Sequence, residues 1–322
     1  MNEQRTRSWV ARRGLGVGLI ALFTVVACSG AATPTAAPSA DPTRDKLAQV
    51  LARGTLVLWT DPDYAPQSFA VPEASRLATT KCAPNQMTAP EVSGYDAEVG
   101  KLVAAAWGVE PCFVTAPFDQ VIAGGWGDHW DIAWASGALS ADRMQQLYMT
   151  QPYYSTPANF FVRADSPYQK PSDLDGKKIG ACSGCTHELY LKGTLALPGE
   201  SLTPAVQDPQ IVTYASETPG YEDLAAGTID AFLSSQTVGL AAIADGKPLR
   251  MLEPAAFFTQ KTGYVDRALT LDPVAFLDRI DSTISDLHAQ GKLKALSMQF
   301  FGADLASAAA AFDLASVGQK VP

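Results

Sequence analysis

The sequence predicts an α/β fold in two lobes, each a mainly parallel sheet flanked by helices. Short apolar runs of strand length alternate with segments that carry apolar residues at helical spacing, as in strands joined by crossover helices. The length of 322 residues also favours more than one domain. Pro152 and Pro157 bracket an extended segment rich in Tyr, Ser and Thr, which we interpret as a crossing between the lobes.

Composition and charge exclude some classes of partner. Hydrophobic residues make up 47% of the chain and charged residues 18%, which is ordinary for a folded protein. The net charge is −9, and Lys and Arg cluster only at the N-terminus. Nucleic acid and anionic membrane surfaces are therefore not expected as general partners.

Residues 1–28 have the pattern of a secretory signal, with an apolar run at 14–27 that is too short to span a bilayer comfortably. Cys28 follows this run and resembles the acylated cysteine of a bacterial lipobox; ordinary secretion with a free cysteine is the alternative. Residues 29–45 are small and Pro-rich, which is typical of a flexible tether. The basic residues expected before the apolar run of a secretory signal are Arg5, Arg7, Arg12 and Arg13.

Four further cysteines follow the tether, and an even number in an exported chain favours two disulfides. Of the three possible pairings we favour the sequence-local one, Cys82–Cys112 with Cys182–Cys185. The second pair also fits a redox pair or half of a metal site. Because no second CxxC exists and the histidines are scattered, we expect no metal.

The first lobe is expected to begin at residue 46 and to continue to residue 156. Its expected elements are a helix at 46–53, a strand at 54–59, a polar excursion at 70–91, a helix at 94–107 that ends at Gly108, a strand at 112–116, a short helix from 118 and a buried strand at 130–135.

The stretch after this last strand predicts an anion site. Ser136–Ala138 is expected to be a loop, and Ser140 the N-cap of a helix with Arg143 in its first turn. A cation is misplaced at a helix N-terminus unless something negative lies in front of it. Free N–H groups beside a guanidinium suit a carboxylate. The alternative is an exposed Arg143 paired with Asp142.

The second lobe is expected at 157–250, and the chain then returns to the first lobe at 251–303. Two amphipathic helices between 276 and 301, broken at Gly291, should pack on the first lobe, and 304–322 should be a weakly structured tail. The expected elements of the second lobe are strands at 159–163, 176–182, 210–214, 229–233 and 248–252, and helices from 186, at 219–226 and at 236–245.

A series of motifs over about residues 47–302 resembles the bacterial extracellular solute-binding proteins of family three, the polar amino-acid receptors of ABC importers. The motifs are Thr60–Pro66, Gly94-Tyr95-Asp96, Asp131 with Ser136, Ser140 and Arg143, Met149–Tyr154, Asp173–Gly180, Gly184-Cys185-Thr186 and Leu224–Ala231. The resemblance implies a type II periplasmic-binding-protein-like fold, with a two-segment hinge, whose lobes close over a small ligand.

The resemblance also implies which residues bind the ligand. Arg143 would pair with a carboxylate that the backbone of Ser136 and Ala138 positions. Gly184 and Thr186, at a helix N-terminus in the second lobe, would bind the same anion. Three more residues would surround the rest of the ligand: Tyr64 and Tyr95 would sandwich its side chain, although both could be core aromatics, and Asp61 would hold a distal polar group.

One position departs from the family pattern. Amino-acid receptors usually place an Asp after the strand that ends the last motif, to take the α-ammonium, and here that residue is Ser235. A buried ammonium without a counter-charge is costly. Either Asp61, Asp63 or Glu188 supplies the acid, or the ligand has no α-ammonium. An amino acid is the main prediction and another carboxylate the alternative.

Enzymes of the cyclohexadienyl dehydratase type share this fold and add a general acid, and His187 and Glu188 lie beside the expected anion loop. A His or Glu at a helix start is more often a cap, so we expect a binding protein and not an enzyme. It would act without cofactor, as a monomer lipid-anchored to the outer face of the cytoplasmic membrane, and deliver its ligand to an ABC transporter permease.

Overall fold

The computed structural model describes residues 41–319. The expected signal at 1–28, the lipobox Cys28 and nearly all of the tether lie outside the described residues. Within them, no helix combines the length and the apolar character needed to cross a membrane.

A mixed sheet of 11 strands organises the described part of the chain, in the order β11-β10-β12-β9-β14-β7-β1-β6-β4, with β13 paired to β9 and β8 to β14. Its strands are β1 (Thr55–Trp59), β4 (Met87–Thr88), β6 (Glu110–Val114), β7 (Ile132–Ala138), β8 (Leu147–Met149), β9 (Tyr154–Arg163), β10 (Lys178–Cys182), β11 (Gln210–Tyr214), β12 (Ala231–Ser235), β13 (Leu249–Met251) and β14 (Phe257–Asp266). A small sheet of β2 (Asp63–Tyr64), β3 (Ser68–Ala70) and β5 (Val92–Ser93) flanks the polar excursion, whose own strand β4 joins the main sheet.

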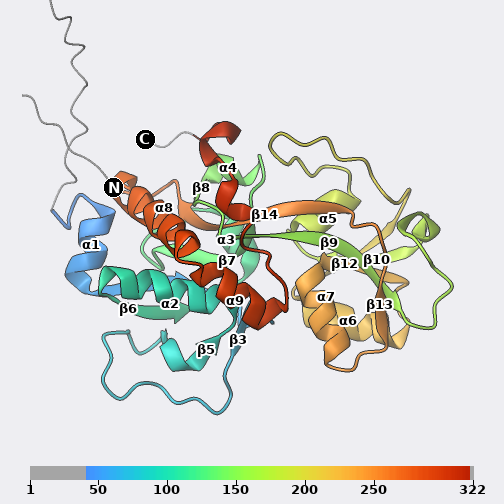
Figure 1. Cartoon of the computed structure of the whole chain (residues 1–322), viewed down its shortest axis with the longest axis horizontal. Helices are drawn as coiled ribbons and strands as arrows, with labels where there is room; N and C mark the ends of the chain where they lie inside the picture. The colour runs from blue at the N-terminus through green and yellow to red at the C-terminus, as the bar shows by residue number, and fades with distance from the viewer. Residues whose placement is uncertain (1–40, 320–322) are drawn as a thin grey trace, which may run out of the picture. The chain divides into compact units, whose positions relative to one another are not determined.

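The pairing of these strands confirms the predicted fold class. Strand β1 is parallel to β6 and β7 in the first lobe, and β10 is parallel to β11 and β12 in the second. The lobes meet at β9 and β14, which pair antiparallel from Tyr154–Lys261 to Ala158–Phe257. Figure 1 shows these two long strands running between the helices of the first lobe and those of the second.

The outward crossing lies at the predicted place, but the return to the first lobe does not. Strand β13 still pairs with β9 in the second lobe, and Leu252 and Phe257 belong to the core of that lobe. The chain therefore returns within β14 and not at residue 251. The sequence hides this strand because Thr259, Gln260 and Lys261 interrupt its apolar pattern.

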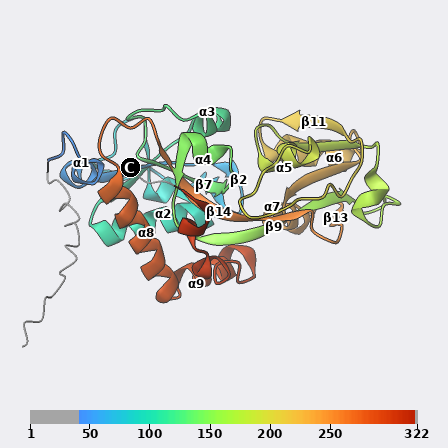
Figure 2. The same cartoon turned by 90° about the horizontal axis from the view of Figure 1, so that it is seen from above.

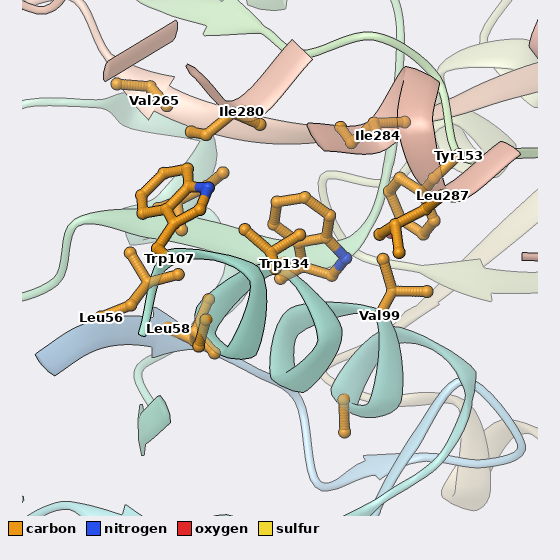
Figure 3. Close-up of a cluster of buried hydrophobic side chains, with 14 of the residues drawn as sticks. Leu56, Leu58, Val99, Trp107, Trp134, Tyr153, Val265, Ile280, Ile284 and Leu287 are labelled. Carbon is orange, nitrogen blue, oxygen red and sulfur yellow. The ribbon is translucent and has the colours of Figure 1, made fainter. Parts of the chain in front are cut away.

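Helices cover both faces of the first-lobe part of the sheet (Figure 2). One face packs against α1 (Lys46–Arg53), α2 (Tyr95–Trp107), α8 (Val274–Ala289) and α9 (Lys292–Phe301). Figure 3 shows Trp107 and Trp134 in this core, with Ile280 and Ile284 of α8 above them. The opposite face packs against α3 (Phe118–Ala123) and α4 (Arg143–Gln146).

The second lobe repeats this arrangement with fewer residues. Helix α5 (Thr186–Leu191) and the 3-10 turn η2 (Pro171–Leu174) pack on one face of β9, β10 and β12. Helices α6 (Glu217–Ala226) and α7 (Gln236–Ala244) pack on the other. Both lobes therefore have the layered helix–sheet–helix cores that alternating strands and helices predict.

The C-terminal tail is more ordered than the sequence predicts. Over its described part it forms two short 3-10 helices, η3 (Ala309–Ala311) and η4 (Leu314–Val317). A further 3-10 helix, η1 (Ala89–Glu91), lies in the first lobe. Phe312, Leu314 and Val317 pack on the first-lobe core. The Gln319 side chain accepts from Met149 N–H and donates to its carbonyl, both at 2.7 Å. A side-chain amide that forms the two hydrogen bonds of a neighbouring strand cannot be recognised from the sequence.

A buried carboxylate ties the start of the folded chain to the sheet. Asp131 is 1% exposed and pairs with Lys46, which is 0% exposed, at 2.8 Å, and with Arg53. It also accepts from the Val57 N–H at 2.8 Å. Asp131, at the head of the arginine motif, thus has a structural role, because it anchors α1 to β1 and β7.

We expect Asp131→Asn to lower the free energy of unfolding by about 3–5 kcal/mol, because it leaves the Lys46 ammonium buried without its counter-charge. Asp128→Asn is the matched control, since Asp128 also lies 3.6 Å from Lys46 Nζ but its side chain is 71% exposed. That variant should lose less than about 1 kcal/mol. Equal losses for the two variants in urea unfolding would contradict this account.

Candidate functional site

A pocket lies where the two lobes face each other, at the carboxyl ends of β1, β10 and β11. Its walls come from the residues after β1, from β7 and β14, from the Cys182–Thr186 loop and from the start of α6. The space between its walls is about 570 Å³, part of which is open to solvent. Open α/β sheets bind ligands at this end of their parallel strands.

Arg143 lines this pocket as a buried cation without an acid. Its side chain is 6% exposed, and it forms no ion pair with any described residue. Its Nη1 donates to the Tyr264 hydroxyl at 2.7 Å and to the Ala138 carbonyl at 3.4 Å, and its Nη2 donates to the Gly184 carbonyl at 3.0 Å. Three of five guanidinium donors are then used, and two remain for a ligand.

The local structure around Arg143 differs from the prediction. The expected loop Ser136–Ala138 is the end of β7, paired with β14, and Ser140 is not an N-cap. Helix α4 begins at Arg143 and has only four residues. The alternative ion pair with Asp142 is also wrong, because Asp142 is exposed and the two side chains do not pair.

Tyr264 explains why residue 137, in strand β7, is a glycine. A Cβ at Gly137 would lie 2.3 Å from the Tyr264 ring, so only glycine lets the ring cross β7. The Tyr264 hydroxyl then reaches both Arg143 and the Ala138 carbonyl, each at 2.7 Å. The position of Arg143 therefore depends on a residue that is distant in sequence.

Ser136 and Ala138 both line the pocket, but the expected backbone donor at Ser136 is occupied. The Ser136 N–H donates to the Tyr153 hydroxyl at 2.8 Å. Its Oγ donates to Asp96 at 2.6 Å and also contacts the Tyr154 hydroxyl at 2.6 Å. Ser136 has a φ of 52°, which is uncommon outside glycine. This network fixes the pocket floor.

The second lobe contributes a loop closed by a disulfide. Both predicted pairings are confirmed, with S–S distances of 2.04 Å for Cys82–Cys112 and 1.94 Å for Cys182–Cys185. Cys182, Cys185 and Thr186 line the pocket. The potential ligand atoms of Cys182, Cys185 and His187 lie within 4.8 Å of one another, but cysteines joined in a disulfide offer no thiolates to a metal.

The expected anion-binding role of Gly184 needs correction. Its N–H donates to Glu188 Oε2 at 2.6 Å, and its carbonyl accepts from Arg143. Gly184 thus links the lobes through its carbonyl and offers no free donor. Its φ of 70° suits glycine. Only Thr186, the first residue of α5, lines the pocket as expected.

Tyr64 lines the pocket, whereas Tyr95 does not. Tyr95 is fully buried in the first-lobe core, where its hydroxyl donates to the Tyr153 carbonyl at 2.9 Å and its ring packs on Phe301. The expected pair of tyrosines around a ligand is therefore not formed. The aromatic walls are Tyr64, Trp59 and Phe118, and Arg143 Cζ lies 5.3 Å from the Phe118 ring centroid.

The sequence offered Asp61, Asp63 and Glu188 as partners for a ligand ammonium in place of the Asp that is absent at position 235. Only one of these three lines the pocket. Asp61 lines it, and burial raises the pKa of this carboxyl. Asp63 is exposed. Although burial alone would raise the pKa of Glu188, hydrogen bonds from Lys192 and the Gly184 N–H lower it. Ser235 is 1% exposed and is closed off by the Tyr64 hydroxyl, 3.2 Å from its Oγ.

Two buried ionisable residues in the pocket were missed from sequence, Glu217 and Lys261, which are 4% and 3% exposed. Neither carboxylate oxygen of Glu217 accepts a hydrogen bond, and burial raises its pKa to about 8. The Ser234 hydroxyl, whose proximity lowers this pKa, also makes no hydrogen bond. Burial, together with the nearby Arg143, lowers the pKa of Lys261 to about 7.

Sequence signals for these two residues were weak. Glu217 follows Ser216 at the start of α6, where an acid usually serves the helix dipole. Lys261 lies in the polar run that also hid β14. An acid at a helix start and a lysine in a polar segment are both most often exposed, so only the fold shows that they are buried.

Within residues 41–319, four hydrogen bonds span the cleft and hold the lobes together. Besides the bond from Arg143 to Gly184, the Ala141 N–H donates to the Ala196 carbonyl at 3.0 Å. Tyr64 contacts Ser235, and the Gln67 amide donates to the Thr237 hydroxyl. The lobes are therefore closed around the pocket.

We expect the double variant Cys182→Ser/Cys185→Ser to weaken ligand binding on the order of tenfold, because the loop that carries Thr186 loses its preorganisation. Cys82→Ser/Cys112→Ser is the control, since that disulfide lies outside the pocket. It should lower the free energy of unfolding by about 2–4 kcal/mol, as for a closed loop of this length, and leave affinity unchanged. Calorimetric titration and urea unfolding separate the two effects.

The raised pKa values predict an unusual pH dependence of stability. Burial raises the pKa of Asp96 to about 7 from 3.8 and that of Glu217 to about 8 from 4.5. Between pH 5 and 7 the folded protein holds protons that the unfolded chain loses, so the free energy of unfolding falls as pH rises. The lowered pKa of His187 acts in the opposite direction within this range but is outweighed by the two acids. The lowered pKa of Lys261, about 7, also acts in the opposite direction, mainly above pH 7.

We therefore expect the ligand-free protein to be more stable at pH 5 than at pH 7, with Glu217 alone contributing about 2 kcal/mol. Glu217→Gln should flatten the slope by that amount. Glu222→Gln, an exposed position on the same helix, should keep the wild-type slope. Parallel slopes for wild type and Glu217→Gln in denaturant unfolding at pH 5, 6 and 7 would contradict the assignment.

Comparison with known proteins places this geometry in a family. L-cystine-binding protein TcyJ of Escherichia coli K12 is 24% identical over 261 residues, which cover 80% of this chain and 87% of that protein. An L-arginine-binding protein of Pseudomonas aeruginosa PAO1 is 26% identical over 223 residues, 67% of this chain and 82% of that protein.

Solved structures share the fold at lower identity. The structure of Tv2483 bound to L-arginine has a TM-score of 0.67 at 18% identity and covers 82% of this chain and 96% of that one. The ancestral amino-acid-binding protein AncCDT-1, a precursor of cyclohexadienyl dehydratase, has a TM-score of 0.64 at 18% identity, with 80% and 100% covered.

The family model for the bacterial extracellular solute-binding proteins, family 3, matches residues 56–303. This range runs from β1 to the end of α9 and contains every residue that lines the pocket. The chain belongs to the bacterial extracellular solute-binding proteins of family 3.

Proposed function

We propose that this protein is the amino-acid receptor of an ABC importer, exported, lipid-anchored through Cys28 and acting as a monomer. The relatives named above bind L-cystine and L-arginine, and all share the two-lobed fold or its sequence signature. The Pro-rich segment after Cys28 is long enough to hold the lobes away from a membrane surface. The captured amino acid passes to the membrane permease when the lobes open.

One observation carries this proposal. Arg143 is a buried guanidinium in an interlobe pocket, and no acid among the described residues pairs with it. Leaving such a charge uncompensated is costly. A ligand carboxylate supplies the missing counter-charge, and it would do so at the contact between the lobes, since Arg143 also bonds to Gly184 of the second lobe. Ligand binding and closure are thereby coupled.

The pocket favours binding over catalysis. His187 lines it, but burial lowers its pKa well below the ordinary value, and the nearby Lys261 and Arg143 lower it further, so the imidazole is neutral. Hydrogen bonds keep Glu188 ionised despite its burial. Neither residue can then donate a proton readily at pH 7. We propose that the ligand leaves chemically unchanged.

A panel of amino acids tests the proposal, because a ligand that binds only the folded state raises the melting temperature. For an amino acid that does so, we expect Arg143→Ala to cost about 2–5 kcal/mol of binding free energy in calorimetry, since the ligand carboxylate loses its partner.

Arg163→Ala is the matched control for this variant. Arg163 lies outside the pocket, and its side chain is 40% exposed. It should bind as the wild type does. Unchanged affinity in Arg143→Ala would rule out the carboxylate clamp, and a melting temperature unmoved by every amino acid would rule out the amino-acid receptor.

A further inference from the structure

Opposite charges remain unpaired in the same buried pocket. Glu217 approaches from the start of α6 in the second lobe, and Lys261 from β14. The two form no ion pair with each other, and the side chain of Lys261, which is 3% exposed, makes no hydrogen bond or ion pair with any described residue. Buried charges are normally paired. Two such groups that face one cavity without meeting therefore point to a ligand between them.

The two cations lie together on one side of this gap. The backbone of Lys261 is paired with Ala138, whose carbonyl accepts from Arg143. Arg143 keeps two free donors and Lys261 keeps three. A single carboxylate with four lone-pair sites can accept from both. The neighbouring cations thus fit one shared anion, which relieves their mutual repulsion.

The acid on the opposite wall fits a cation. Both Glu217 oxygens are buried and accept no hydrogen bond. A ligand ammonium, with three donors, would satisfy them. Glu188 is tied to Lys192 and Gly184. Asp61 is only partly buried and already accepts from the Asp63 N–H at 3.0 Å, so it is better placed for a distal group of the ligand.

We infer that the ligand is held as a zwitterion, with its ammonium on Glu217 and its carboxylate shared by Arg143 and Lys261. The inference rests on the proposed function and adds to it the two side chains that select an amino acid over a simple carboxylic acid. Glu217 recognises the ligand's amino group, and Lys261 is a second cation, after Arg143, that binds the ligand's carboxylate.

The panel of amino acids includes L-arginine and L-cystine. For each amino acid that raises the melting temperature, the experiment compares its affinity with that of the corresponding carboxylic acid that lacks the amino group. The wild type should bind the amino acid more tightly. Glu217→Gln should weaken the amino acid at least about 30-fold, since a buried ion pair loses one partner. It should change the des-amino acid by less than about threefold. Lys261→Met should weaken both.

Glu222→Gln, exposed on the same helix, should leave both affinities unchanged. If Glu217→Gln keeps the wild-type preference for the amino group, or Asp61→Asn abolishes it instead, the assignment of Glu217 is overturned. If the wild type binds a des-amino acid but no amino acid, the zwitterion is overturned and the carboxylate clamp stands. If it binds neither, the proposed function itself fails.

Proton release gives a second readout that a purely structural role would not change. Glu217 is faced by Asp61, Tyr64, Tyr221 and Lys261, and with its pKa near 8 it is mostly protonated at pH 7 in the empty pocket. An ammonium requires the ionised form, so binding must release that proton. Calorimetry in two buffers of different ionisation enthalpy should show fewer protons released by Glu217→Gln. An unchanged count would contradict the inference.

Discussion

The antiparallel pairing of β9 with β14 is the constraint on which the rest of the structure depends. These two ten-residue strands carry the chain out of the first lobe and back. Strand β9 pairs with β12 of the second lobe, β14 pairs with β7 of the first lobe, and the two pair with each other. They join the first-lobe and second-lobe parts of the 11-stranded sheet. Lys261 lies on β14, and Tyr264, three residues later, holds Arg143. The hinge and the pocket floor are thus the same element.

The pocket is organised by charge that the protein does not neutralise itself. Outside the pocket, the buried charge of Asp131 is well paired with Lys46 and Arg53. In the pocket, Arg143, Lys261 and Glu217 form no ion pairs among the described residues. Such an arrangement lowers stability when the site is empty and favours a ligand whose charges complement it. Specificity and closure then have one physical origin.

Much of the fold was predictable because it depends on local patterns. Alternating apolar runs gave the strands, Gly108 and Gly291 marked helix ends, and cysteine spacing gave both disulfides. Strand β14 was missed because its central residues are polar, and the ordered tail because Gln319 pairs through a side chain. Both features depend on partners that are distant in the sequence.

The site was predicted less completely than the fold. Asp61, Tyr64, Ser136, Ala138, Arg143 and Thr186 meet at the pocket as expected. Tyr95 joins the core instead, and the Ser136 and Gly184 N–H groups bond within the protein, since motifs locate residues along the chain but not the donors they use. Glu217 and Lys261 carry no motif. Their role depends on burial, which a single sequence does not reveal.

A crystal structure of the protein with an amino acid that raises its melting temperature tests the central claim most directly. The account predicts a carboxylate within hydrogen-bond distance of Arg143 and Lys261, and an ammonium on Glu217. A ligand seated between the lobes with its charged groups away from these three residues would contradict the claim. So would a ligand that binds only at another site, such as the cavity beside Trp126 and Trp130.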